Sequence, residues 1–208
     1  MSSSLAIIDY GVGNLRSVAN ALAAVGCEAT VTSQPEDLRA ADRIILPGVG
    51  AFGDCMANLR KAGWIEVLEE EVRHKGKPFL GLCVGMQMLA TTGKEQGTYE
   101  GLNWVPGVVE RITSRDPTVR VPHIGWNDVR FTARDGLYKG SGDTQTFYFV
   151  HSYVFHPNDP SVASGFCSYG EEFVASLEVG NIYATQFHPE KSQKAGLGVL
   201  KNFLARQV

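Results

Sequence analysis

The segment Gly81-Leu82-Cys83-Val84-Gly85 constrains the fold more than any other part of this 208-residue chain. The apolar residues just before it predict a short strand, and residues 86–90 predict the start of a helix. Such an abrupt strand-to-helix turn forces its central side chain into the open, while the flanking glycines let the backbone fold back tightly. The sequence therefore predicts an α/β fold in which Cys83 stands on an elbow, residues 81–85.

A thiol at this position is a candidate nucleophile. The helix N-terminus presents unpaired backbone N–H groups and the positive end of the helix dipole, and both favour the thiolate. The alternative is a buried, inert cysteine, which is a common state of free cysteine. A catalytic Cys83 also needs a base, a group that orients the base, and donors for an oxyanion.

The composition is typical of one compact domain, which we expect to span residues 1–208. Hydrophobic residues make up 44% of the chain, charged residues 20%, and the formal net charge is −3. This charge gives no reason to expect binding to nucleic acid or to an anionic membrane. The N-terminal residues lack the pattern of a signal peptide, and no apolar run approaches the ~18 residues of a membrane span.

The four cysteines, Cys27, Cys55, Cys83 and Cys167, are scattered and show no C-x-x-C spacing. They predict neither a metal site nor a disulfide framework. A cytoplasmic location is expected, because a reducing compartment keeps a catalytic thiol free. Apart from Cys83, the cysteines receive no functional role.

The first ninety residues alternate strand-like and helical segments. Strands are expected at 5–9, 28–32, 43–46 and 78–82, and helices at 14–25, 53–60 and 62–74, with Asn14 as the cap of the first helix. This alternation predicts a parallel sheet covered on both faces. Ligands in such sheets bind beyond the C-terminal strand ends, where the turns 10–13, 47–50 and 81–85 are expected.

From about residue 100 the pattern becomes mostly an antiparallel meander. Strands are expected at 105–112, 119–126, 146–150, 162–167, 173–177 and 182–187, followed by a helix at 192–206. The whole chain therefore predicts a mixed central sheet with helices on both faces and antiparallel strands in its C-terminal half.

His188 is the strongest candidate for the base, because it follows a predicted strand within His188-Pro189-Glu190. Spacing i, i+2 in an extended segment puts His188 and Glu190 on one side, and Pro189 keeps the segment extended. The imidazole can then face the thiol while the carboxylate holds its other nitrogen. A surface His–Glu pair is the alternative. Weaker candidates for the base are His74, His123, His151 and His156.

Two backbone segments are candidates for an oxyanion hole. The N–H of Val84, just after the thiol, is one donor. The loop Pro47-Gly48-Val49-Gly50 is expected to supply the other, from Val49 or Gly50, because its glycines permit close approach to a substrate. An ordinary tight turn is the alternative.

Three motifs, taken in order, resemble the class I (triad) glutamine amidotransferases over essentially the whole chain. They are Pro-Gly-Val-Gly at 47–50, Gly-Leu-Cys-Val-Gly-Met-Gln at 81–87, and Gln-Phe-His-Pro-Glu-Lys at 186–191. Residues 9–18, 122–127 and 148–153 further resemble the glutaminase subunit of imidazole glycerol phosphate synthase, an enzyme of histidine biosynthesis. The resemblance implies a flavodoxin-like fold and a Cys83–His188–Glu190 triad that hydrolyses glutamine to glutamate and ammonia.

The resemblance also implies a substrate pocket. Gln87 and Glu95 are expected to bind the α-amino and α-carboxylate ends of glutamine, although residues 92–94 depart from the family's commoner acidic, serine-containing run. For Gln87 the alternative is a solvated helix residue. The same pocket is expected to be lined by Gly48, Gly50, His151, Ser152 and Tyr153.

An ammonia-producing subunit of this kind needs an acceptor site. The chain has no Gly-rich phosphate cradle and no eightfold βα repeat, so that site is expected on another chain. The resemblance implies no cofactor, and it implies a heterodimer with a (β/α)8 cyclase subunit. Positions that match the family's subunit interface are Asn14, Trp126, Tyr148 and Lys191. The alternative role is a helix cap for Asn14, core packing for Trp126 and an ordinary solvated charge for Lys191.

Other functions remain open from the sequence. The chain could serve another synthase, in a pyridoxal phosphate or nucleotide pathway, although the subunit-specific stretches argue against this. It could be a catalytically silent partner-binding subunit, which the intact triad residues argue against. A free-standing cysteine hydrolase or peptidase would share the elbow and a histidine.

Overall fold

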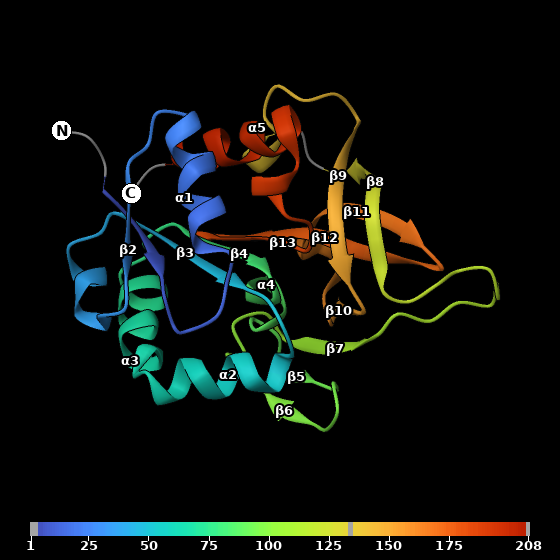
Figure 1. Ribbon diagram of the computed structural model, residues 1–208, viewed down its shortest axis with the longest axis horizontal. Coiled ribbons are helices and arrows are strands. Elements are labelled where there is room, and N and C mark those ends of the chain that lie inside the picture. Colours follow the sequence, from blue (N-terminus) through green and yellow to red (C-terminus); the bar gives the residue numbers. More distant parts are fainter. Residues whose placement is uncertain (1–3, 133–134, 207–208) are drawn as a thin grey trace.

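The computed structural model describes residues 4–132 and 135–206, which form a layered α/β structure around one large sheet (Figure 1). In spatial order its strands are β2 (Ala29–Thr32), β1 (Leu5–Ile8), β3 (Arg43–Gly48), β4 (Phe79–Cys83), β13 (Ile182–Thr185), β12 (Glu171–Val179), β11 (Ala163–Tyr169), β8 (His123–Phe131) and β9 (Thr144–His151).

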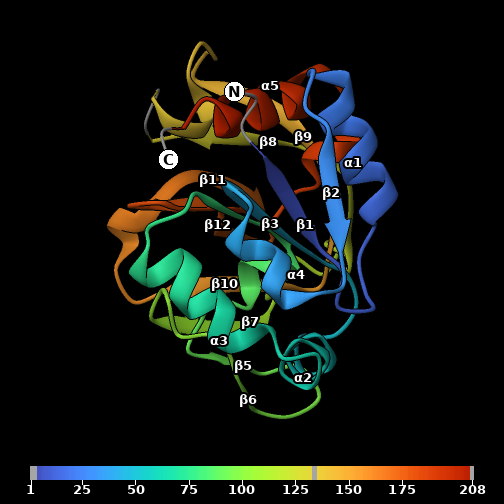
Figure 2. The same cartoon turned by 90° about the vertical axis from the view of Figure 1, so that its left-hand side faces the viewer.

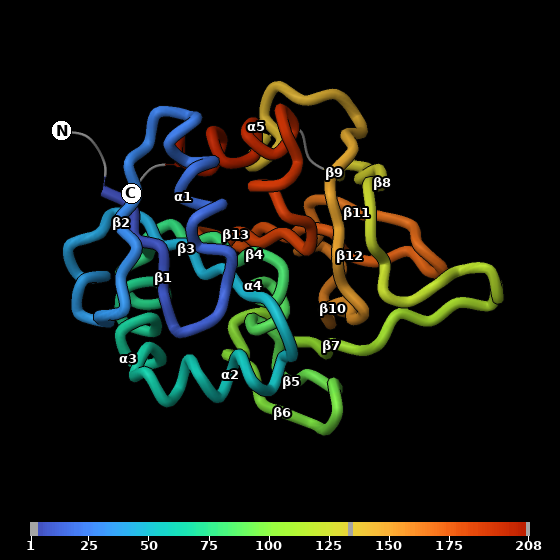
Figure 3. Tube along the Cα trace, viewed as in Figure 1, coloured from blue at the N-terminus to red at the C-terminus, as the bar shows by residue number. Residues whose placement is uncertain are grey.

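Strands β2, β1, β3, β4 and β13 are parallel, and the remaining strands continue the sheet in antiparallel fashion. The predicted mixed sheet is therefore confirmed. The Cα trace shows that β13, near the end of the chain, runs beside β4 (Figure 3). The strand predicted at 119–126 is displaced and occupies His123–Phe131.

Helices cover both faces of the parallel half (Figure 2). On one face lie α1 (Leu15–Ala24) and α5 (Gln193–Leu204), and on the other α2 (Phe52–Lys61) and α3 (Trp64–Leu68). Successive strand side chains point to opposite faces, so Ile7 joins the core under α1 and α5, whereas Ile8 joins the core under α2 and α3. Both clusters are buried, as expected for a parallel sheet.

The helix predicted at 62–74 is not regular. After α3 the chain continues as a wider, π-type helical segment, Glu69–His74. The buried carboxylate of Glu71 lies in this segment and is held by the ammonium groups of Lys75 and Lys77, at 2.7 and 2.8 Å. Short 3-10 turns occupy Pro35–Arg39, Gly136–Tyr138, Pro160–Val162 and Pro189–Lys191.

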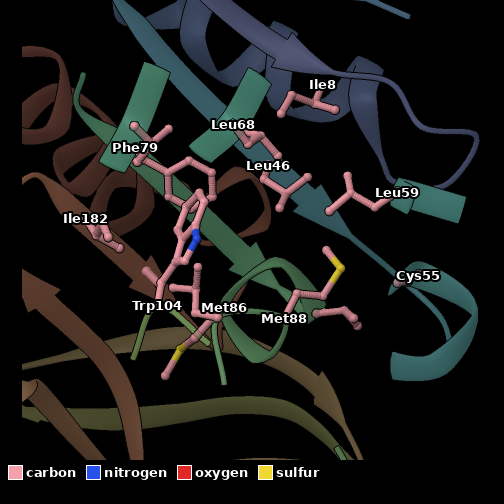
Figure 4. Close-up of a cluster of buried hydrophobic side chains, with 14 of the residues drawn as sticks. Ile8, Leu46, Cys55, Leu59, Leu68, Phe79, Met86, Met88, Trp104 and Ile182 are labelled. Atoms are coloured by element: carbon pink, nitrogen blue, oxygen red, sulfur yellow. The ribbon is translucent and has the colours of Figure 1, made fainter. Parts of the chain in front are cut away.

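The core on the α2 side reaches the elbow directly. Figure 4 shows Met86 beside Trp104, in the buried cluster to which Leu46 and Phe79 also belong. Met86 belongs to α4 (Val84–Gln87), the short helix that begins immediately after Cys83. The elbow is therefore anchored by apolar packing.

A second sheet was not predicted. It contains β10 (Tyr153–Pro157), β7 (Gly107–Arg111), β5 (Thr92–Gly93) and β6 (Tyr99–Glu100). Only Ser152 separates β9 of the large sheet from β10 of the small one, so the chain changes sheets at residues 151–153. Within the described residues, no helix combines the length and the apolar character that crossing a membrane requires.

Candidate active site

The elbow has a strained backbone at Cys83 itself. Its φ of 55° lies in the left-handed region, which is uncommon for a residue other than glycine. Gly81 and Gly85 instead provide space. A Cβ on Gly85 would overlap the carbonyl oxygen of Leu46, and one on Gly81 would lie 2.6 Å from the Gly85 oxygen. The glycines therefore allow β3, β4 and α4 to pack closely.

The prediction that Cys83 projects into the open is wrong, because only 4% of the residue is exposed. It lies in the wall of a cavity of about 430 Å³. The cavity lining contains most of the predicted pocket, namely Val49, Gly50, Cys83, Val84, Gln87, Glu95, His151, Ser152, Tyr153 and His188. Gly48 does not line it and faces a much smaller cavity behind the triad, together with Asn14 and Glu190.

The strand order explains how distant segments meet. In the register of β3 and β4, Gly48 lies opposite Cys83. In the register of β4 and β13, Thr185 lies opposite Leu82. Because these strands are parallel, the loop after β3 and the segment after β13 flank the elbow at one edge of the sheet.

His188 and Glu190 are both buried and paired. The Nδ1–H of His188 donates to Oε1 of Glu190 at 2.8 Å. The predicted extended geometry holds only at His188, whose φ and ψ are −97° and 96°, because Pro189–Lys191 forms a 3-10 turn. The hydroxyl of Ser192 donates to the His188 carbonyl at 2.6 Å and fixes this turn.

The electrostatics of His188 favour its charged form. Burial by itself would lower the pKa of His188, but the negative charge of a Cys83 thiolate and the carboxylate of Glu190 raise it to about 10. The Cys83 sulfur lies 3.6 Å from Nε2 of Gln186 and 4.0 Å from the Val150 carbonyl oxygen. The charges around His188 therefore favour its imidazolium form, next to the sulfur of Cys83.

Two side chains for which the sequence predicts no site role, those of Tyr10 and Cys55, hold the loop 47–50. The hydroxyl of Tyr10 donates to the Pro47 carbonyl at 3.0 Å, and the thiol of Cys55 contacts the Val49 carbonyl at 3.4 Å. In a trans peptide the N–H points opposite to the C=O, so the Gly50 N–H is directed away from Cys55. Burial raises the pKa of Cys55 to about 11, so this thiol stays protonated and can donate.

Gln87 is not solvated, since it is only 3% exposed. Its Nε2 donates to the Tyr153 carbonyl at 3.0 Å and to Oε1 of Gln186 at 2.9 Å, which leaves its own oxygen available as an acceptor. Glu95 accepts from the backbone N–H of Phe52 at 2.8 Å. Gln186, which lies within the motif at 186–191, was missed as a site residue although it contacts both Gln87 and Cys83.

A buried pair of histidines adjoins the cavity. Nδ1 of His151 lies 2.9 Å from the Tyr153 carbonyl oxygen, and Nε2 of His151 lies 3.0 Å from Nδ1 of His123. Burial lowers the pKa of His123 to about 4. Burial, opposed by the Tyr153 hydrogen bond, lowers the pKa of His151 to about 3. From the sequence, His123 is predicted only as a weak candidate for the base.

We expect this pair to make the protein acid-sensitive. The unfolded histidines bind protons below about pH 6.5, whereas the folded ones stay neutral until about pH 4. Stability is therefore lost as the pH falls from 6.5 toward 4, with His151 contributing up to about 1.4 kcal/mol per pH unit. Urea unfolding at pH 7, 6 and 5 measures this slope. His151→Gln should make the free energy of unfolding depend less on pH, whereas His74→Gln, at an exposed site, should leave that dependence unchanged. An equal pH dependence in the wild type and both variants would refute the role of the buried pair.

Three of the four predicted interface residues lie together. Trp126 is 49% exposed on β8, its ring centroid lies 5.9 Å from that of Tyr148, and Nζ of Lys191 lies 5.8 Å from the Tyr148 ring centroid. Ile124 lies two residues before Trp126 on β8, so its side chain is on the same face of the strand, and it is 60% exposed. We call Ile124, Trp126, Tyr148 and Lys191 the aromatic patch.

The predicted cap of α1 is not formed as expected. Asn14 occupies the N-cap position, but among the described residues its side chain makes no capping hydrogen bond. It borders the small cavity shared with His188 and Glu190. In the described part of the chain, no cluster of three or more acidic, histidine or cysteine side chains could hold a metal ion.

Comparison with known proteins gives a consistent result. A family model described as glutamine amidotransferase class-I matches residues 6–207. The chain is 49% identical over 205 residues to the imidazole glycerol phosphate synthase subunit HisH of Geobacter sulfurreducens, covering 97% of this chain and 98% of that protein. It is 47% identical over 199 residues to the protein of the same name from Moorella thermoacetica, covering 96% and 93%.

Solved structures share the fold at lower identity. A putative GMP synthase protein from Thermoplasma acidophilum aligns with a TM-score of 0.71 and 18% identity, covering 98% of this chain and 93% of that one. PurLQS from Thermotoga maritima aligns with a TM-score of 0.73 and 20% identity, covering 98% of each chain. At these identities the likeness establishes the architecture.

Proposed function

The chain belongs to the class-I glutamine amidotransferase family, and from this premise we propose that it is the glutaminase subunit of an imidazole glycerol phosphate synthase. It is accordingly an enzyme that hydrolyses the side-chain amide of glutamine, and we take residues 1–208 as one amidotransferase domain. The observation that carries the proposal is the buried pair of His188 and Glu190 side chains beside Cys83, with Cys83 and His188 both in the wall of the cavity.

The proposed reaction begins with the thiolate of Cys83 attacking the amide carbon of glutamine. The oxyanion that forms lies between the N–H of Val84 and an amide of the Val49–Gly50 loop. The imidazolium of His188 gives its Nε2 proton to the departing nitrogen, which leaves as ammonia. His188 then takes a proton from water as that water attacks the thioester, and glutamate leaves while the thiolate–imidazolium pair is restored. Glu190 orients the ring throughout through Nδ1.

The hydrogen-bond pattern refines the proposed roles of Gln87 and Glu95. Both present oxygen acceptors to the cavity, since the amide hydrogens of Gln87 are already used. Acceptors suit the α-ammonium group of glutamine and repel its carboxylate. We therefore assign both residues to the ammonium end. The α-carboxylate would be held by donors at the sheet-changing segment 151–153.

Ammonia that escapes into water is protonated and lost as a nucleophile, so the proposed product must pass to a partner. We propose a heterodimer with a (β/α)8 cyclase subunit that makes imidazole glycerol phosphate and an aminoimidazole carboxamide ribonucleotide. Support comes from the aromatic patch, where the large apolar side chains of Ile124 and Trp126 are exposed next to each other on one strand, and from Asn14, which borders the small cavity shared with His188 and Glu190. We expect the complex in the cytoplasm, where the Cys83 thiol stays reduced.

Partner-stimulated glutamine hydrolysis tests this function. The isolated chain should hydrolyse glutamine slowly, and the cyclase subunit loaded with its nucleotide substrate should raise the rate roughly 10²- to 10³-fold, the value of one well-placed oxyanion donor. A steady-state glutamate assay with and without the partner measures the effect. Trp126→Ala in the aromatic patch should weaken the stimulation, whereas Val31→Ala, at an exposed position on the remote edge strand β2, should not. Equal rates with and without the partner would contradict the proposal.

A further inference from the structure

A line of hydrogen-bonded polar side chains, partly buried at Asn127 and buried at His123 and His151, connects strand β8 with the active-site cavity. It runs from Asn127 through His123 and His151 to the backbone carbonyl of Tyr153. Successive donor–acceptor distances are 3.4, 3.0 and 2.9 Å. We call Asn127, His123, His151 and the Tyr153 carbonyl the histidine relay. Only its last two members line the cavity of the proposed glutaminase site.

The chemistry of the end group sets the direction of every bond in the relay. A carbonyl oxygen can only accept, so Nδ1 of His151 carries a proton and donates to Tyr153. The Nε2 atom of neutral His151 is then an acceptor, so Nδ1 of His123 must donate to it. By the same argument Nε2 of His123 is an acceptor, and the amide of Asn127 donates to it. Both histidines are thereby fixed as the Nδ1–H tautomer.

The donor at the start of the relay has a fixed orientation. The Asn127 amide nitrogen also donates to the Ser168 carbonyl at 3.0 Å, and its amide oxygen accepts from the Asp128 backbone N–H at 2.8 Å. A flipped amide would lose both bonds. Asn127 therefore presents an N–H, and not an oxygen, to His123.

Packing holds the middle of the relay. The His123 ring is stacked between Tyr169 and Phe149, with centroid distances of 3.9 and 4.8 Å. In the antiparallel register of β8 and β9, His123 lies directly opposite His151. The two rings therefore have little freedom to rotate or exchange tautomers independently.

The far end of the relay reaches the pocket through the Tyr153 carbonyl. This oxygen accepts from Nδ1 of His151 and also from Nε2 of Gln87. Gln87 then keeps its remaining oxygen free, which is the group that we assign to the α-ammonium of glutamine. An ordered Tyr153 carbonyl is therefore needed to orient Gln87.

We propose that Asn127 and His123 are positioning residues for the glutamine pocket, which act by holding His151 as a neutral Nδ1–H tautomer and, through the Tyr153 carbonyl, by orienting Gln87. The positioning role rests on the proposed glutaminase function, whereas the assignment of the tautomers does not. A neutral His151 also avoids a second cation beside the imidazolium of His188, with which it would interact unfavourably.

The tautomers are tested by 15N NMR of the full chain with 15N-labelled histidine at pH 7. His123 and His151 should each show a protonated Nδ1 and an unprotonated Nε2, the tautomer that free histidine disfavours. Signals are assigned by replacing each histidine in turn with glutamine. A protonated Nε2 on either His123 or His151 would overturn the relay, whether or not the protein hydrolyses glutamine.

The positioning role is tested with Asn127→Asp, because a carboxylate accepts where the amide donates and so reverses the first bond of the relay. Nε2 of His123 should become protonated in the NMR spectrum. The glutamine concentration for half-maximal hydrolysis should rise about tenfold, the equivalent of one lost hydrogen bond, while the maximal rate changes less than about threefold.

The matched control is Asp128→Asn, the reverse change in charge at the next residue, whose side chain is exposed on the other face of β8. It should leave both the tautomers and the half-saturating glutamine concentration unchanged. If Asn127→Asp protonates Nε2 of His123 but the half-saturating concentration stays at the wild-type value, the positioning role is wrong. If the wild-type protein hydrolyses no glutamine with its partner, the proposed function fails, and the NMR result still decides the relay.

Discussion

Replacing Cys83 with alanine is expected to abolish glutamine-dependent synthesis by the complex with its cyclase partner, while synthesis supported by added ammonium salt continues. In the proposed function, Cys83 supplies the nucleophile, whereas the acceptor site is on the cyclase subunit. Removal of a nucleophile costs roughly 10⁴- to 10⁶-fold in rate. Parallel assays of imidazole glycerol phosphate formation with glutamine and with ammonium chloride measure the two activities.

Cys167→Ala is the matched control for this experiment, because Cys167 is also a buried cysteine but lies on β11, outside the cavity. It should retain both activities. Loss of the ammonia-dependent activity in Cys83→Ala would show that Cys83 supports the fold or the contact with the partner and would contradict its role as nucleophile.

Gly85→Ala is expected to destabilise the whole protein and to disrupt the elbow. A Cβ at this position overlaps the carbonyl oxygen of Leu46, a backbone atom of β3 that cannot move without displacing the loop 47–50. Overpacking of this kind costs about 3 kcal/mol or more, which corresponds to a fall in Tm of roughly 10 °C for a domain of this size. Thermal unfolding followed by circular dichroism measures it, and glutaminase activity should be lost even below the new Tm.

Gly198→Ala provides the comparison, since a Cβ on Gly198 in α5 meets nothing within 4 Å. This change should raise stability by up to about 1 kcal/mol, because alanine is the better helix former. A stable, active Gly85→Ala protein would show that the close approach of α4 to β3 is not required.

The strand-helix alternation and the two chemical motifs could be predicted because they depend on neighbouring residues. Runs such as 43–46 and 78–82 have the length and apolar character of buried strands, and β3 and β4 are found there. The mixed sheet with helices on both faces followed from the same patterns. The glycines around Cys83 were also visible, although their role proved to be close packing while Cys83 itself takes the strained φ.

Other features could not be predicted, because they depend on contacts between distant segments. The pattern at 153–157 does not say which sheet it joins, and the change of sheet at Ser152 creates one wall of the pocket. Gln186, Tyr10 and Cys55 carry no distinguishing signal by themselves. Each gains a role only because the fold brings it to Cys83 or to the loop 47–50.

The sequence by itself determined the chemical groups of this protein: a cysteine on a tight elbow, a histidine two residues from a glutamate, and a glycine-containing loop. The tertiary structure decided which of these groups meet, because the parallel register of β3, β4 and β13 places their ends at one edge of the sheet. The tertiary structure also decided the protonation states of three histidines. Burial keeps His123 and His151 neutral, whereas the charges of Cys83 and Glu190 keep His188 cationic, and neither environment exists before the chain folds.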